Sequence, residues 1–176
     1  MDDEHDEQLE RRVRDALDGL SADYEMIECD PSFADTAAFC AHYGFALDES
    51  ANCIVVVGKG AERTYAACLA LADTRLDVNG LIRKRLGVKK TSFASADETV
   101  TATAGMRIGG VTPFGLPAGL PIWIDSRVTE RARVIVGGGS RRCKVYVAAS
   151  AFSTLPHVEI ITDLARPAPA AGGEGQ

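Results

Sequence analysis

Two apolar segments joined by a short turn constrain the fold of this chain most. Residues 52–58 read NCIVVVG and residues 63–71 read RTYAACLAL, with the turn KGAE between them. Apolar runs of this length around a short Gly-containing turn predict a β-hairpin. The first arm is almost wholly apolar, as in strands that are covered on both faces. We therefore expect residues 52–58 to form a central strand of a sheet.

Helical and strand patterns alternate irregularly around this hairpin. Apolar spacing, capping residues and glycine stops predict helices over residues 4–19, 34–44, 76–87 and 95–105. Apolar runs predict strands over residues 23–29, 90–95, 120–125, 132–138, 144–150 and 158–162, with a helical turn over residues 151–156. Helices and hairpins interleave without a regular βαβ alternation, so we expect an α+β class and one mixed-sheet domain.

Composition and length set the domain organisation. The chain has 176 residues, of which 46% are hydrophobic and 25% charged, which is typical of one globular domain. We assign this domain to residues 1–165. Residues 166–176 contain no core-forming side chain and are expected to be a disordered tail. The sequence has no long apolar run and begins with an acidic segment, so we expect a cytoplasmic protein with no membrane partner.

The residues that bind metals or activate nucleophiles form no recognisable pattern. The five cysteines are widely and irregularly spaced and the three histidines are scattered, so we expect reduced thiols and no metal site. No G-x-S-x-G elbow, Walker loop or Rossmann fingerprint is present. We therefore expect no cofactor and no nucleotide-dependent chemistry.

Charge is distributed unevenly along the chain. The net charge of −6 argues against a protein that coats nucleic acid nonspecifically, because such binding depends on many phosphate contacts. Two basic patches nevertheless remain. One is the segment LIRKRLGVKK, with Arg83 and Lys84, and the other is SRRCK, with Arg141, Arg142 and Lys144. Charge pattern alone favours solvated surface for both patches.

The segment RIGGVTPFGLPAGLPIWID, residues 107–125, precedes a predicted buried strand. Glycine allows positive φ or close approach of another group, whereas proline fixes φ and removes an amide donor. This composition predicts a loop whose backbone shape matters. The residues by themselves name no reaction.

The order of ANCIVVV, YAACLALADTRLDVNGLIRKRLGVKKTSFAS, TATAGMRIGGVTPFG, LPIWID and VIVGGGS resembles the YbaK and prolyl-tRNA synthetase-associated domain family. The resemblance runs from about Leu9 to Leu164, and its most specific part is the G-x-x-x-P loop, Gly109 to Pro113. It implies a barrel-like sheet with flanking helices and an editing domain or free-standing deacylase of mischarged tRNA.

The resemblance also implies roles for individual residues. Gly109, Gly110, Val111 and Thr112 would line the site of the aminoacyl ester, and Pro113 would stiffen its far wall. Backbone amides there would stabilise the oxyanion that forms on the ester carbonyl. Water or a ribose hydroxyl would attack, so no enzyme nucleophile is needed. Further substrate contacts are expected from Arg107, Phe114, Thr103, Arg83, Lys84 and Arg141.

Two positions depart from the family pattern. Asn52 stands where the family carries a lysine ahead of the first long apolar strand, and Lys144 stands where related deacylases often carry an aspartate. In one interpretation, Lys144 returns an ammonium group to the same pocket from a facing strand. In the other, Lys144 points to solvent and the pocket has lost its charge.

The resulting hypothesis is a free-standing deacylase that hydrolyses the ester between a small mischarged amino acid and tRNA. The alternative is a non-catalytic family member that binds tRNA ends or a small ligand through the same loop. The expected partner is the acceptor end of an aminoacyl-tRNA. The amino acid, the tRNA and the oligomeric state remain open at this stage.

Overall fold

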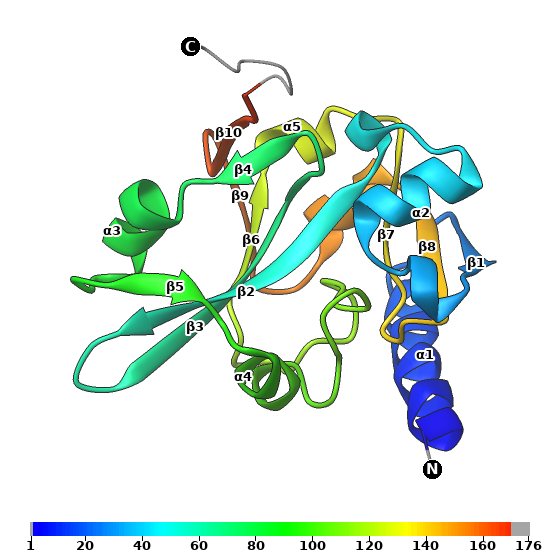
Figure 1. The fold of residues 1–176 in the computed structure, drawn as a ribbon, viewed down its shortest axis with the longest axis horizontal. Helices are drawn as coiled ribbons and strands as arrows, with labels where there is room; N and C mark the ends of the chain where they lie inside the picture. Colours follow the sequence, from blue (N-terminus) through cyan, green and yellow to red (C-terminus); the bar gives the residue numbers. More distant parts are fainter. Residues whose placement is uncertain (1, 170–176) are drawn as a thin grey trace.

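The computed structural model describes residues 2–169, which fold into one α+β unit (Figure 1). The helices are α1 (Asp2–Gly19), α2 (Thr36–Tyr43), α3 (Arg83–Leu86), α4 (Ala96–Ala102) and α5 (Ser126–Thr129). The strands are β1 (Tyr24–Glu28), β2 (Ala51–Lys59), β3 (Arg63–Leu71), β4 (Thr74–Leu76), β5 (Thr91–Phe93), β6 (Ile122–Asp125), β7 (Arg133–Gly137), β8 (Cys143–Ala148), β9 (Val158–Ile161) and β10 (Ala165–Pro167).

The strands form three sheets. The largest has the order β5-β2-β3-β6-β9, and it is mixed because β2 pairs antiparallel with β5 and β3, whereas β6 runs parallel to β3 and β9. The second has the order β1-β8-β7, and β10 with β4 forms the third. The α+β class and the mixed sheet are confirmed, and β2 is an internal strand, although β3 holds the central position. The barrel-like sheet is not found, since the sheets of residues 2–169 do not close.

The main core lies between the large sheet and the three-stranded sheet, and α1 covers one side of it. The apolar face of α1, which consists of Leu9, Val13 and Leu17, is buried there. Its neighbours include Leu69 of β3 and Val145 of β8. A second apolar cluster covers the opposite face of the large sheet, around Val56, Cys68, Ile82, Trp123 and Leu164. The large sheet is thus buried on both faces, as the apolar first arm of the hairpin predicts.

Two predicted elements differ from the structure. The helix expected over residues 76–87 is a π-helical turn, Val78–Ile82, followed by the short helix α3. The side chain of Asp77 accepts hydrogen bonds from the amides of Gly80 and Leu81 and so caps that turn. The segment expected to be a disordered tail begins in β10, where Arg166 lies opposite Arg75. Residues 170–176 lie outside the described residues.

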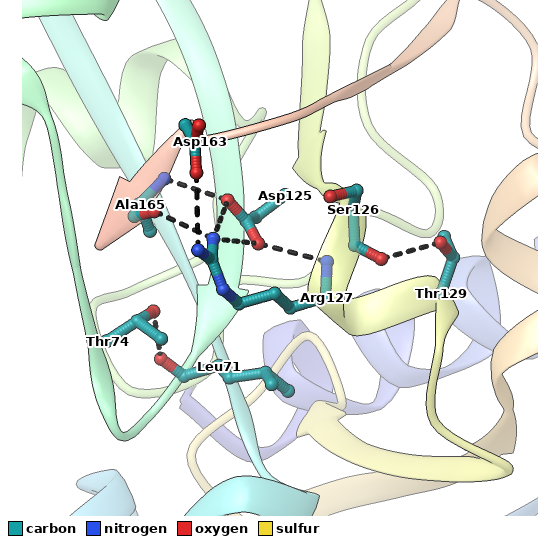
Figure 2. Close-up of polar contacts among 8 residues, drawn as sticks. All are labelled: Leu71, Thr74, Asp125, Ser126, Arg127, Thr129, Asp163 and Ala165. Atoms are coloured by element: carbon teal, nitrogen blue, oxygen red, sulfur yellow. Dashed lines mark hydrogen bonds and ion pairs between the residues drawn. The ribbon is translucent and has the colours of Figure 1, made fainter. Parts of the chain in front are cut away.

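A buried carboxylate attaches this C-terminal strand to the large sheet (Figure 2). Asp125, at the end of β6, is fully buried and accepts hydrogen bonds from the amides of Arg127 and Ala165. The Arg127 guanidinium donates back to the Ala165 carbonyl at 2.9 Å and pairs with Asp163 at 3.2 Å. Pairing with Asp125 raises the pKa of Arg127 above its usual value. β10 is therefore held by a charged network as well as by β4.

None of the helices within residues 2–169 combines the length and the hydropathy needed to span a membrane.

Candidate functional site

A cavity of about 420 Å³ lies where the edge of β2 has no strand neighbour. β5 pairs with β2 only from Val56 to Gly58, and a single bridge joins Ser50 to Ile135 of β7. Between these points, residues 51–54 pair only with β3 in the described part of the chain. Unpaired strand edges carry N–H and C=O groups that can bind a ligand. The cavity thus combines strand backbone with side chains from several elements.

Six further segments enclose this cavity. They are the start of α2, the end of β5, α4, the loop of residues 107–121 (called the Gly-Pro loop below) and the facing ends of β7 and β8. The wall consists mainly of apolar and small side chains, and its polar members are Asp35, Thr36, Asn52, Thr99 and Lys144. Ligand cavities typically have this composition, with a few convergent polar groups in an apolar wall.

The glycines of the loop allow its backbone to lie directly on a second glycine-rich segment, residues 137–140. Gly109 has a φ of 93°, a backbone angle that residues with a side chain rarely adopt. A Cβ on Gly110 would lie 2.6 Å from the carbonyl oxygen of Ser140, and a Cβ on Gly137 would lie 2.2 Å from that of Val111. The amide of Gly139 donates to the Gly110 carbonyl at 2.8 Å. Glycine is therefore required here for close backbone approach.

This packing also determines which loop amides are available. The amide of Gly110 donates to the Arg107 carbonyl at 2.8 Å, so it closes a turn and does not face a ligand. Gly109 and Val111 are the loop residues that line the cavity. Their backbone is the part of the loop that a bound ester would meet.

Lys144, on β8, places its ammonium group in the cavity wall. The residue is only 6% exposed, and its Nζ donates to the carbonyl of Ala34 at 2.6 Å and to that of Gly109 at 2.8 Å. Burial lowers the pKa of Lys144 from its usual value. An ammonium group has three donors, so one N–H remains beyond these two bonds. Lys144 therefore lies in the cavity and not in solvent.

Asn52 lies in the same cavity, on β2, and is hydrogen-bonded to Thr36 at the start of α2. The Thr36 hydroxyl donates to the side-chain oxygen of Asn52, which leaves the amide donors of Asn52 for a ligand. The two positions that depart from the family pattern thus share one cavity. Asn52 supplies neutral donors there, and Lys144 supplies the charge.

The N-terminus of α2 adds a favourable field for negative charge. Asp35, Thr36 and Ala37 line the cavity, and the Asp35 side chain makes no capping hydrogen bond. The first amides of a helix have no partner within the helix and carry partial positive charge. An oxygen that becomes negative in this cavity would thus lie near two kinds of donor: the α2 amides and Lys144.

Cys53 is the one cysteine that lines the cavity among the described residues. Burial raises the pKa of the Cys53 thiol to about 12. A nucleophilic cysteine acts as the thiolate, so this residue is unsuited to attack an ester. No group of three His, Cys, Asp or Glu side chains in residues 2–169 is arranged to hold a metal ion.

Gly110 does not line the cavity, and neither do four further predicted site residues. Pro113 lines a separate apolar hollow near the end of α1, and Phe114 is fully buried in the main core, stacked on Phe152. Thr103 is fully buried, and its hydroxyl bonds to the backbone of Thr99 and Met106. Thr112 is also fully buried, and its hydroxyl has no hydrogen-bond partner in the described residues.

The predicted basic contacts are also dispersed. Arg107 pairs with Asp2 of α1 at 3.2 Å. Arg141 donates to the carbonyls of Ile108 at 2.7 Å and Pro31 at 3.0 Å, so it braces the loop from outside. Arg83 and Lys84 lie on α3 and do not line the cavity. Of these four residues, Arg141 is the one in contact with the Gly-Pro loop.

Several residues that form the cavity were not predicted from the sequence. Thr99 of α4 lies in its wall, and Phe93 and Ile108 lie at its rim with more than half of each residue exposed. Phe93 lies within the strand predicted over residues 90–95, and Ile108 adjoins Gly109 and Gly110, so their positions in the sequence offered a signal. The orientation that exposes them depends on tertiary packing.

Comparison with known proteins identifies the family of this chain. Two solved structures share the fold. The first is a hypothetical protein at 20% identity and a TM-score of 0.73, and the match covers 88% of this chain and 99% of that chain. The second is a candidate trans-editing enzyme for prolyl-tRNA synthetase at 22% identity and a TM-score of 0.71, and the match covers 87% of this chain and 94% of that chain. The sequence matches the aminoacyl-tRNA editing domain over residues 30–155, well over half of its length. The chain therefore belongs to the aminoacyl-tRNA editing domain family, whose substrates are tRNAs that carry an amino acid.

Proposed function

We propose that this protein is a free-standing deacylase that hydrolyses the ester between a small mischarged amino acid and the acceptor end of tRNA. The observation that carries this proposal is the buried ammonium group of Lys144 in the cavity beside the glycine loop. Family membership supports an aminoacyl-tRNA substrate. The proposal adds the reaction, the size class of the amino acid and the residues responsible.

The chemistry requires stabilisation of charge on the ester carbonyl. Attack by water or by the neighbouring ribose hydroxyl turns this oxygen into an oxyanion, and preorganised donors lower the energy of that state. The third N–H of Lys144 and the N-terminal amides of α2 are the donors that support this role. No side chain needs to attack, in agreement with the raised pKa of Cys53.

The wall composition supports a preference for small side chains. Ala51, Val55, Val111 and the backbone of Gly109 give the wall short side chains that a compact substrate side chain can contact closely. A cavity excludes larger side chains by steric clash, whereas it discriminates weakly against smaller ones. Alanine, cysteine and serine are thus the amino acids that we expect to be released.

The test is release of amino acid from tRNA misacylated with alanine, cysteine or serine, compared with buffer and with tRNA that carries a bulkier amino acid. The proposal predicts release of at least one small amino acid well above the buffer rate, with much slower release of the bulky one. Equal rates with and without protein for all substrates would contradict it.

A second candidate function is a non-catalytic module that binds the tRNA end. It is favoured by Asn52 in the place of the family lysine and by the two bonds that Lys144 makes to Ala34 and Gly109. In this alternative, the ammonium group serves only to hold the loop. Saturable binding of aminoacyl-tRNA without any hydrolysis would identify this function.

A further inference from the structure

A second hollow, of about 360 Å³, adjoins the cavity across the edge of β2. The two share three wall residues, Asn52, Ile54 and Phe93. The remaining wall of the second hollow comes from β3, β4 and the turn between them, namely Ala70, Leu71, Thr74, Arg75 and Leu76. The cavity and the second hollow therefore meet at this part of β2.

The register of the sheet explains how the shared residues come together. Phe93 of β5 lies opposite Val56 of β2, so its side chain is on the same face of the sheet as that of Val56. Ile54 and Asn52 follow at intervals of two and share this face. Ala70 lies opposite Asn52 on β3 and supplies a small floor.

Phe93 exposes 56% of its surface although it is a large apolar residue. It lies on β5, which is an edge strand of the large sheet. An exposed aromatic ring at the junction of two hollows provides a platform for a flat ring, because every nucleobase has a π-face that can stack on it. Arg75, at the other end of the hollow, is exposed and forms no ion pair within residues 2–169.

We propose that the second hollow binds the terminal nucleoside of the tRNA, with its base on Phe93 and the phosphate on its 5′ side near Arg75. This inference rests on the proposed function, since the nucleoside must lie next to the ester that occupies the cavity. Asn52, between the two hollows, donates its free amide hydrogens to the sugar or the ester. Phe93 thus determines substrate binding, and Lys144 stabilises the reacting oxygen.

The hollow can be tested without any hydrolysis. Adenosine 5′-monophosphate is titrated into the full chain and followed by NMR, with ribose 5-phosphate as the probe that lacks a base. We expect the nucleotide to shift the signals of Asn52, Ile54 and Phe93, and ribose 5-phosphate to leave them unchanged. Phe93→Ala should weaken nucleotide binding about 10-fold, whereas Phe93→Tyr keeps the ring and the affinity.

A matched control is Ile160→Ala. Ile160 is also an exposed apolar strand residue, but it lies on β9 at the opposite edge of the sheet. This variant should bind the nucleotide like the wild type. In deacylation assays, Phe93→Ala should raise KM for the aminoacyl-tRNA about 10-fold and leave kcat nearly unchanged.

The outcomes separate this inference from the proposed function. If nucleotide binding depends on Phe93 but the protein hydrolyses no ester, nucleoside binding in the second hollow is supported and the deacylase proposal is refuted. Hydrolysis with an unchanged KM in Phe93→Ala would refute nucleoside binding in the second hollow and leave the deacylase proposal intact. Nucleotide-induced shifts confined to another surface would have the same consequence. A dimer contact formed by Phe93 would be detected as a lower molecular mass of Phe93→Ala in solution, and it would also refute the inference.

Discussion

At the scale of single residues, Lys144 and Asn52 determine what the cavity can do. A buried ammonium group is costly unless its donors are satisfied. Lys144 meets this requirement through two backbone carbonyls, one of which belongs to the Gly-Pro loop. The same hydrogen bonds hold the loop in place and orient the ammonium group of Lys144. A charge is thus present in the cavity although the family lysine position holds Asn52.

The pH dependence of hydrolysis should reflect this burial. Burial lowers the pKa of Lys144, and the active form is the protonated ammonium group. Activity should therefore decline as the pH rises through this lowered pKa, which is below the value of about 10.4 for an exposed lysine. The measurement is kcat/KM across the neutral and alkaline range, corrected for spontaneous ester hydrolysis. A rate that stays level to the pKa of an exposed lysine would contradict this role.

The loop glycines give a second prediction at this scale. Gly110→Ala places a Cβ 2.6 Å from the backbone oxygen of Ser140, and overpacking of this kind costs about 1–3 kcal/mol. We expect a lower free energy of unfolding in urea and a loss of hydrolysis. Gly119→Ala, in the same segment, is the matched control, because its Cβ would meet nothing within 4 Å. Equal stability of the two variants would argue against close packing of the loop.

The positions of the predicted site residues relative to the cavity differ from one residue to the next. Gly109 and Lys144 line the cavity, as the relocated-lysine interpretation expects. Thr103, Pro113 and Phe114 do not line it, because the direction of a side chain in a loop or at a helix end depends on packing that spacing does not encode. Phe114, for example, stacks on Phe152, which is 38 positions further along the chain.

At the scale of elements, local patterns predicted the long elements well and the short ones poorly. The hairpin of β2 and β3 and the helices α1 and α2 carry clear apolar patterns and caps. β4 and β10 are three residues each, and they pair with each other although residues 77–164 separate them in the sequence. Such pairs form because Asp125 and Arg127 hold residue 165 in place. Neither periodicity nor composition indicates such a contact.

This network predicts a difference between two aspartates. Asp125→Ala leaves the buried amide of Ala165 without its acceptor, which should lower the free energy of unfolding by about 1–3 kcal/mol. Asp163→Asn keeps a residue type that tolerates the positive φ of 58° at this position, removes only the charge of an exposed partner of Arg127, and should cost about 1 kcal/mol or less. Urea unfolding of both variants provides the comparison. Similar losses in both would show that β10 is not anchored through the buried carboxylate.

At the scale of the whole molecule, charge limits how the protein can hold tRNA. The net charge is −6, and several of the predicted phosphate contacts are paired within the fold. Arg142, for example, lies among Asp3, Asp6 and Glu10 of α1. These ion pairs attach α1 to the glycine-rich segment behind the loop. They favour a site that recognises the end of its substrate over one that binds a long stretch of backbone.

Salt dependence tests this picture. With about two or three phosphate contacts, binding of aminoacyl-tRNA should weaken roughly 10- to 40-fold between about 50 mM and 200 mM salt. Proteins with many phosphate contacts lose about 1,000-fold or more over this range. The slope of log Kd against log salt concentration is the measurement. A slope as steep as that of the many-contact proteins would contradict recognition of the substrate end alone.

The central claim is that the buried ammonium group of Lys144 stabilises the reacting ester. The most direct measurement is the single-turnover rate of amino acid release by Lys144→Gln, with Lys59→Gln, an exposed lysine at the end of β2, as the control. Loss of an oxyanion donor typically costs about 100-fold or more in rate. The account predicts a loss of this size in Lys144→Gln and none in Lys59→Gln. A folded Lys144→Gln variant that hydrolyses the ester at the wild-type rate would contradict it.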